Sequence, residues 1–261
     1  MPFHQVDAIR YLTFDSLASL EVPHAVFTRR GGVSPAPWAS LNVGSLVGDQ
    51  PEYVAENRRR SFAALGRNPD SLYDVWQVHS ADVVIAEAPR YGAQHRRADA
   101  ILTDRRAVTL YMRFADCVPI LLYDPERNAV GLAHAGWQGT VKKVAAVAVK
   151  AMQARYGSRP AALLAAIGPS IGPHHYPVGE EVAAQVRQAF GAAADALLEA
   201  TNGHSEVQFD LWAANRLVLE QAGVQQVEVS RICTACSLED WYSHRGEQGR
   251  TGRFGALIAV R

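Results

Sequence analysis

The sequence is poor in cysteine and has no excess of charge of either sign. Only three cysteines occur in 261 residues, Cys117, Cys233 and Cys236. An odd and low count excludes a disulfide framework and indicates a reducing compartment. Lysine plus arginine (26) balances aspartate plus glutamate (26). This balance argues against a nucleic acid or an anionic membrane as the main partner, although it allows a local basic pocket.

Long apolar runs are also missing. No stretch approaches the roughly 20 apolar residues that cross a bilayer. The N-terminal segment MPFHQVDAIRYLTF lacks the basic region and apolar core of a secretory signal. We therefore expect a cytoplasmic protein whose partners are neither membranes nor nucleic acids.

Several common cofactor and catalytic motifs are absent. No G-x-G-x-x-G follows a predicted strand, and there is no phosphate-binding loop with its lysine and no G-x-S-x-G. The segment IGPSIGP is rich in glycine and proline but lacks the spacing that cradles phosphates. These absences exclude the commonest nucleotide-binding and hydrolase signatures.

The patterns that are present predict a single α+β (mixed α/β) domain over residues 1–261. Hydrophobic residues make up 48% and charged residues 20%, as in globular proteins. Most of the first 50 residues lack periodicity, but Trp38, Leu41 and Val43 indicate packing. Grouped strands separated by short links favour mixed sheets over a doubly wound parallel sheet. We predict helices at 51–66, 139–157, 179–190, 192–200 and 209–223, and strands at 74–80, 82–87, 107–114, 118–124, 128–135, 162–169, 227–232 and 254–260.

Three potential metal ligands stand at the ends of predicted strands: His79, Cys117 and His134. Two histidines and one cysteine leave a fourth position open, as in catalytic zinc sites. Their separations match no local zinc motif, so a buried cysteine with hydrogen-bonded loop histidines is an alternative. A third interpretation makes Cys117 a nucleophile, with a histidine as its base and Asp116 orienting that base.

The remaining cysteines form the segment C-T-A-C. A lone C-x-x-C is half a zinc site or a redox pair, but no second pair accompanies Cys233 and Cys236. We predict two reduced, mostly buried thiols that do not bind a catalytic metal. Adjacent histidines seldom bind one ion together, so we expect a structural role for at least one of His174 and His175.

Arginines beside glycines form the candidate anion site. The guanidinium fork and accessible backbone amides suit phosphate or carboxylate, although solvated loop charge is the ordinary alternative. The candidates are Arg29, with Arg30 next to it, near the N-terminus, and Arg245, Arg250 and Arg253 near the C-terminus. We expect Arg29 and at least one of the C-terminal three to meet at the metal cleft.

Many ordered segments together resemble one family. They include FTRRGGVS, SLNVG, QVHS, ADCVPILLYDP, GLAHAGWQGT, IGPSIGP, FDLWAANR, ICTAC and RTGRFGALI. The chain resembles the multicopper polyphenol oxidase, or laccase-like, YfiH family, now regarded as purine nucleoside phosphorylases with adenosine deaminase activity. The resemblance implies a four-layer α/β/β/α sandwich with mixed sheets. It also implies metal binding by His79, Cys117 and His134.

The chain departs from the family pattern in three places. Gln138 stands where an arginine is usual, His174 and His175 replace cysteines, and Gly246 follows Arg245 where a second arginine is usual. We expect these changes to affect substrate preference and rate more than metal binding.

The resemblance implies a zinc-dependent purine nucleoside phosphorylase acting on adenosine and related nucleosides, with phosphate as co-substrate and with adenosine deaminase activity. Copper is the alternative metal. Asp116 and Asp99 are candidates for moving protons, and Asn42 is a candidate for binding ribose or base, or else an ordinary turn residue. The candidates for binding the anion and the substrate are Arg29, Asn42, Arg245, Arg250 and Arg253.

Other functions remain open at this stage. A copper polyphenol oxidase would use the same His₂Cys set, but a multicopper oxidase also needs a histidine-rich cluster built from H-x-H pairs. The chain has nine histidines and no such pair. A peptidoglycan-precursor amidase and a non-catalytic metal-binding accessory protein are further alternatives. The oligomeric state is left open.

Overall fold

The computed structural model describes residues 1–200 and 207–261 and shows two large sheets stacked between helices. The first sheet has the order β1-β2-β3-β15-β7-β4 and the second the order β14-β10-β8-β9-β6-β5. The first sheet has one parallel pair, β4 with β7, the second sheet has two, β5 with β6 and β10 with β14, and the other neighbouring strands are antiparallel. The strands of the large sheets are β1 (Phe3–Val6), β2 (Ile9–Leu12), β3 (His24–Phe27), β4 (Leu72–Tyr73), β5 (Val83–Ile85), β6 (Ala100–Thr103), β7 (Thr109–Phe114), β8 (Val118–Asp124), β9 (Ala129–Ala135), β10 (Leu164–Ile167), β14 (Gln226–Val229) and β15 (Phe254–Ala259).

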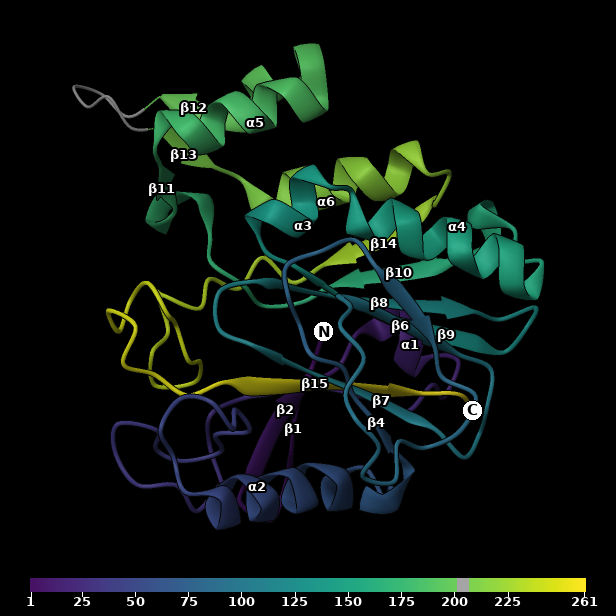
Figure 1. Ribbon diagram of the computed structural model, residues 1–261, viewed down its shortest axis with the longest axis vertical. Coiled ribbons are helices and arrows are strands. Elements are labelled where there is room, and N and C mark those ends of the chain that lie inside the picture. Colours follow the sequence, from purple (N-terminus) through teal and green to yellow (C-terminus); the bar gives the residue numbers. More distant parts are fainter. Residues whose placement is uncertain (201–206) are drawn as a thin grey trace.

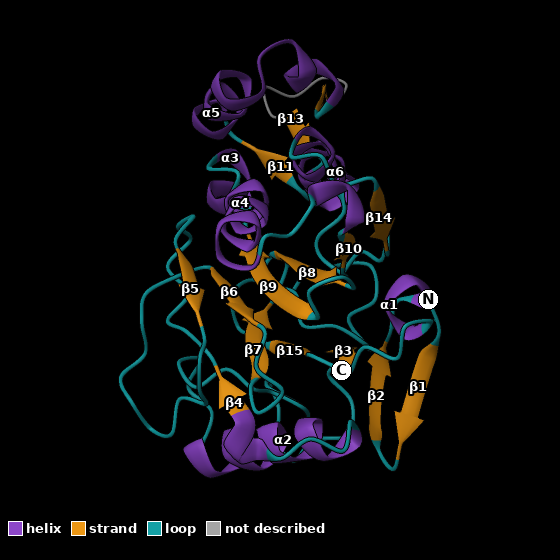
Figure 2. Ribbon diagram, turned by 90° about the vertical axis from the view of Figure 1, so that its right-hand side faces the viewer, coloured by secondary structure: helices purple, strands orange, loops and turns teal. Residues whose placement is uncertain are grey.

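Helices cover the outer face of each sheet, which completes the predicted α/β/β/α order (Figure 1). Helix α2 (Pro51–Ala64) lies against the first sheet, and α4 (Val144–Tyr156) and α6 (Leu211–Gln221) lie over the second. Beyond them, α5 (Glu180–Phe190) accompanies a small antiparallel sheet of β11 (Pro177–Val178), β13 (Val207–Phe209) and β12 (Leu198–Ala200). The short helices α1 (Asp15–Ala18) and α3 (Trp137–Val141) complete the α-helices of the described residues (Figure 2).

Strand alternation explains why the sheets stack. Successive side chains of a strand point to opposite faces. On β15, Ala256 and Ile258 enter the core between the two sheets, whereas Leu257 packs beneath α2. On β8, Leu121 enters the core between the sheets, and Ile120 faces the helices. Both sheets are therefore apolar on two faces, and each needs a helical layer outside it.

The structure confirms most of the predicted elements between β7 and the C-terminus. Helix α6 begins as predicted, since the Asp210 carboxylate accepts a hydrogen bond from the N–H of Ala213 at 2.9 Å, and the helix ends before Gly223. The irregular stretch that follows β3 is also present, with Leu41 and Val43 buried.

Three local predictions are wrong, and some short elements were not predicted. The first 50 residues, most of which are irregular as expected, also contain β1, β2, α1 and β3, which are too short for their periodicity to stand out. Residues 74–80 form a bent loop rather than a strand, with only an isolated bridge at Trp76. The predicted helix 139–157 is interrupted at Lys143, whose φ of 59° is left-handed. The predicted helix 192–200 is a 3₁₀ turn (Gly191–Ala196) followed by β12, which pairs with β13.

None of the helices in the described part of the chain is long and apolar enough to cross a membrane.

Candidate metal centre and active site

His79, Cys117 and His134 converge at one end of the second sheet. Their ligand atoms all lie within 4.8 Å of one another, and Cys117 Sγ is 3.9 Å from His79 Nε2. His134 comes from β9, and Cys117 from the turn between β7 and β8. His79 lies in the bent loop 74–80, where its φ is 58°. The three side chains that the sequence predicts as metal ligands are therefore within reach of a single ion.

Asp99 fixes the orientation of this cluster from behind. It is fully buried, and its Oδ1 lies 2.9 Å from His134 Nδ1. A carboxylate only accepts, so the Nδ1–H of His134 donates and Nε2 is left as the ligating atom. The other carboxylate oxygen accepts the backbone N–H groups of Val78 (3.0 Å) and Ser80 (2.7 Å), on either side of His79. One carboxylate thus holds two of the three candidate ligands.

The surroundings of the cluster favour the ionised forms of Asp99 and Cys117. Burial would raise the pKa of Asp99, but hydrogen bonds from His134 and the neighbouring N–H groups lower it to about 2. Burial likewise opposes the Cys117 thiolate, yet His134 and His79 lower the pKa of this thiol to about 6. The thiolate is the form that binds metals.

The donor set fits a zinc ion. Two imidazole nitrogens and one thiolate suit zinc and leave one tetrahedral position for water or substrate. Gly136 shows how closely the site is packed, because a Cβ atom there would lie 2.8 Å from Cys117 Sγ and 3.1 Å from His79 Cδ2. Only a glycine leaves these two ligands in place.

The cluster opens into a cavity of about 560 Å³, within the range of small-molecule sites. Apolar and aromatic side chains line one part of it, including Leu46, Trp76, Trp137 and Tyr176. Trp76 is 45% exposed, so part of this aromatic residue remains accessible. A smaller cavity of about 280 Å³ shares His79, Cys117 and Tyr176 with the larger one.

Two of the predicted arginines, Arg245 and Arg253, line the large cavity. Arg253 Nη1 donates to the carbonyls of Thr251 (3.2 Å) and Gly252 (2.8 Å), and Arg245 Nη1 donates to the carbonyl of Pro177 (3.2 Å). Neither guanidinium forms an ion pair with a carboxylate of the described residues. Two guanidinium groups without an ion-pair partner among the described residues therefore line the cavity.

Arg29 and Arg250 do not line this cavity. The Arg29 side chain packs over the ring of Tyr242, with its guanidinium carbon 4.3 Å from the ring centroid, and forms an ion pair with Glu247 at 3.0 Å. The N-terminal and C-terminal segments meet through this ion pair, in which Glu247 supplies the anion for Arg29. Arg250 is exposed to solvent and is not among the residues lining the cavity.

The buried side chain of Asn42 forms hydrogen bonds that hold the surrounding loops together. Its Nδ2 donates to Asp49 Oδ2 (2.8 Å), and its Oδ1 accepts the N–H groups of Gly44 (2.9 Å) and Arg253 (2.8 Å). It is absent from the cavity wall, so it contacts the site through its neighbours, not directly. This is the turn role that the sequence had left open.

Asp116 does face the cavity, beside Cys117. Its Oδ1 accepts the hydroxyls of Thr234 and Ser243, each at 2.6 Å, and its Oδ2 accepts the N–H of Arg245 at 2.6 Å. Its φ of 81° is left-handed. Three donors hold this carboxylate between the metal cluster and the C-terminal arginine segment.

Arg113 and Gln77 are wall residues that the sequence did not suggest. Arg113 lies on β7, and its Nη2 donates to the carbonyl of Val75 at 2.6 Å. Gln77 Oε1 accepts the backbone N–H of Arg113 at 3.1 Å. Neither residue stands in a recognisable motif, and only the approach of loop 74–80 to β7 brings them to the cavity.

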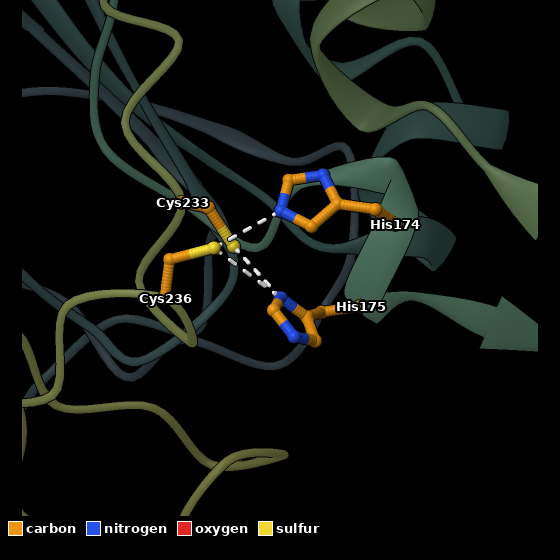
Figure 3. Close-up of side chains that lie close together, drawn as sticks. All are labelled: His174, His175, Cys233 and Cys236. Carbon is orange, nitrogen blue, oxygen red and sulfur yellow. Dashed lines mark hydrogen bonds between the residues drawn. The ribbon is translucent and has the colours of Figure 1, made fainter.

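The CxxC cysteines lie in a second cluster with His174 and His175, outside the cavity (Figure 3). Both cysteines are free thiols, as predicted. Cys233 is buried, but Cys236 is exposed, so the prediction of two mostly buried thiols is wrong for Cys236. The two adjacent histidines both point toward the cysteines.

The fold and the site define a mixed α/β protein with a His₂Cys cluster in an open, arginine-lined cavity. By sequence, the chain belongs to the family described as multi-copper polyphenol oxidoreductase laccase, which matches residues 23–261. It is 43% identical over 242 residues to a purine nucleoside phosphorylase of Deinococcus radiodurans, covering 93% of this chain and 90% of the relative. It is 36% identical over 250 residues to purine nucleoside phosphorylase YlmD of Bacillus subtilis, covering 92% and 89%.

Solved structures agree with this assignment. YlmD from Geobacillus stearothermophilus superimposes with a TM-score of 0.92 at 35% identity, over 99% of this chain and 98% of that one. The hypothetical protein YfiH from Bacillus licheniformis gives a TM-score of 0.91 at 33% identity, over 100% and 99%. The predicted family and fold class are thus confirmed.

Proposed function

We propose that this chain is a purine nucleoside phosphorylase that acts on adenosine and related nucleosides, holds zinc at His79, Cys117 and His134, and also deaminates adenosine. The observation that carries the proposal is the shared cavity, which is lined by the ligand cluster and by two arginines that have no ion-pair partner among the described residues. The names of the relatives support the same reaction.

The chemistry matches these groups. Phosphorolysis breaks the bond between ribose C1′ and the base nitrogen and forms a bond from C1′ to a phosphate oxygen, so adenine and ribose 1-phosphate leave. Arg245 and Arg253 are suited to bind and orient the phosphate, because guanidinium groups donate in pairs to its oxygens. The accessible part of Trp76 offers the purine a stacking surface.

A zinc ion bound at the cluster would supply Lewis-acid chemistry toward a substrate oxygen or a water. Asp99 acts behind His134 and holds its ring, and so positions a ligand without facing the cavity. Asp116 borders the cavity and is the carboxylate placed to accept or return a proton there. Deamination would require such a proton carrier near the purine C6.

The test separates phosphorolysis from deamination by chromatography of adenosine reactions with and without inorganic phosphate. We expect adenine and ribose 1-phosphate only with phosphate, and inosine in either condition. Arg253→Gln should raise the KM for phosphate by roughly 10- to 100-fold, since a charge-assisted contact contributes about 1.5–3 kcal/mol. Arg250→Gln is the matched control, because Arg250 lies in the same segment but outside the cavity.

Three results would contradict the proposal. The first is adenosine consumption without either product class, and the second is an unchanged phosphate KM in Arg253→Gln. The third is oxidation of phenols by the copper-loaded protein at rates above its nucleoside turnover, which would favour the oxidase alternative.

A further inference from the structure

We propose that His174, His175, Cys233 and Cys236 form a second, structural zinc site that is separate from the cavity cluster. All four ligand atoms lie within 4.8 Å of one another. Two thiols and two imidazoles complete a Cys₂His₂ set, which is a closed tetrahedral arrangement without a position for substrate. Figure 3 shows the four side chains pointing at a common centre.

Two of the three distances between the ligand atoms are close to the edge of a zinc tetrahedron, and the third is shorter. His175 Nδ1 lies 3.5 Å from both Cys233 Sγ and Cys236 Sγ, and His174 Nε2 lies 3.0 Å from Cys236 Sγ. Zn–S bonds of roughly 2.3 Å and Zn–N bonds of roughly 2.0–2.1 Å give a nitrogen–sulfur edge of roughly 3.6 Å in a regular tetrahedron. An ion therefore fits with small side-chain adjustments.

The surrounding backbone places a hydrogen-bond donor at the Cys233 sulfur. The N–H of Gly172 donates to Cys233 Sγ at 3.2 Å, which is the kind of contact that stabilises a ligating sulfur. A Cβ atom at Gly172 would lie 2.7 Å from His174 Cε1 and 3.2 Å from Cys233 Cβ. A glycine at this position lets the two ligand-bearing segments approach each other.

The site would join two loops that border the active-site cavity. One loop follows β10 and carries the two histidines, and the other follows β14 and carries the two cysteines. Thr234, between the cysteines, donates to Asp116, and Tyr176, next to His175, lines the cavity. A zinc ion would cross-link these loops in a chain that has no disulfide among its three cysteines.

Zinc is the metal that this donor set selects. Soft thiolates with imidazoles in a tetrahedral arrangement favour zinc over the oxygen-preferring magnesium or calcium. A redox role for the cysteine pair would instead require a disulfide between Cys233 and Cys236, and the two histidines would then bind no metal. The two interpretations differ in metal content and in thiol accessibility.

The experiment counts zinc per chain by elemental analysis in protein purified with a thiol reductant. We expect about two zinc ions in the wild type and about one in Cys236→Ser, as each complete site binds one ion. Ala235→Ser is the matched control, because it places a hydroxyl in the same loop without removing a ligand, and it should keep the wild-type content. If Cys236→Ser does not fold, His174→Ala serves the same purpose.

A second arm keeps this inference independent of the proposed function. His79→Ala removes a ligand of the cavity cluster only, so it should retain the second zinc. Cobalt substituted into that variant should show thiolate-to-cobalt charge transfer, which Cys236→Ser in the same background should weaken. Neither measurement depends on nucleoside turnover.

Several outcomes would overturn the second site. One is that the wild type holds a single zinc ion and His79→Ala loses it, and another is that Cys236→Ser keeps the full zinc content. The others are a second ion that is not zinc and a disulfide between Cys233 and Cys236 in the reduced preparation. The second site would be supported if both thiols are protected from an alkylating reagent and if a chelator removes this protection.

Discussion

Gly136 is the position where a single methyl group would disturb the cavity cluster most directly. It is the N-cap of α3, with φ −71° and ψ −179°, so an alanine is compatible with the backbone. The Cβ of Gly136→Ala would lie 2.8 Å from Cys117 Sγ. Non-bonded contacts of this kind settle at roughly 3.5–4.0 Å, so the sulfur must retreat by roughly 1 Å.

A displacement of this size has a defined consequence. Metal–ligand distances tolerate only about 0.2 Å, and misplacing a reacting group by about 1 Å lowers turnover by roughly 100-fold. We therefore expect Gly136→Ala to lose bound metal at the cavity cluster and to fall about 100-fold in kcat/KM for phosphorolysis. Elemental analysis and the chromatographic assay measure the two effects.

Gly179→Ala is the matched control. Gly179 is the N-cap of α5, also with extended backbone (φ −76°, ψ 169°), and a Cβ there would meet nothing within 4 Å. Both variants share the loss of glycine at an N-cap, and only Gly136→Ala adds the contact with the ligands. Equal metal content and equal turnover in the two variants would refute the assignment of one ion to His79, Cys117 and His134.

Three further predictions follow from contacts around the site. Asp99→Asn should weaken metal binding by roughly 10- to 100-fold, measured by competition with a chelator, because it removes the carboxylate that holds His134; unchanged affinity would contradict this. Burial would raise the pKa of Asp74, but neighbouring cations lower it, so its stabilising effect is present above the unfolded pKa and is lost as the pH falls through the lower folded value. Urea unfolding of Asp74→Asn should therefore depend less steeply on pH below about 4 than the wild type does, and parallel curves would contradict this. Arg29→Gln should lower the free energy of unfolding by about 1.5–3 kcal/mol, because it removes a charge-assisted hydrogen bond to the partly buried Glu247, and should leave the KM for phosphate unchanged; a raised KM would restore an anion-binding role.

Local patterns were sufficient to predict β7 and β15 of the first sheet, β8, β9 and β10 of the second, and the helix that begins after Asp210. These features depend on the alternation of apolar residues and on a cap that lies within three residues of its acceptor. The same kind of information failed for residues 74–80. Their apolar residues are typical of a strand, but hydrogen bonds to the distant Asp99 bend the segment around His79.

The sequence by itself determined the donor types of the cavity cluster. Two histidines and one cysteine stand at the ends of segments that have the apolar pattern of strands. The resemblance to a known family selected this set from the alternatives. Only the tertiary structure decided which arginines face the cavity. Arg29 and Arg253 both stand near glycines, but the partner that neutralises Arg29 is Glu247, 218 residues away along the chain.

The second cluster depends on the tertiary structure in the same way. Adjacent histidines and a lone C-x-x-C are each weak signals, and about 60 residues separate them in the sequence. They meet because β10 and β14 are parallel neighbours, so the loops that follow both strands emerge at the same edge of the sheet. Local propensity carries no information on such pairing, because the contacts that favour it form only when distant strands share one sheet.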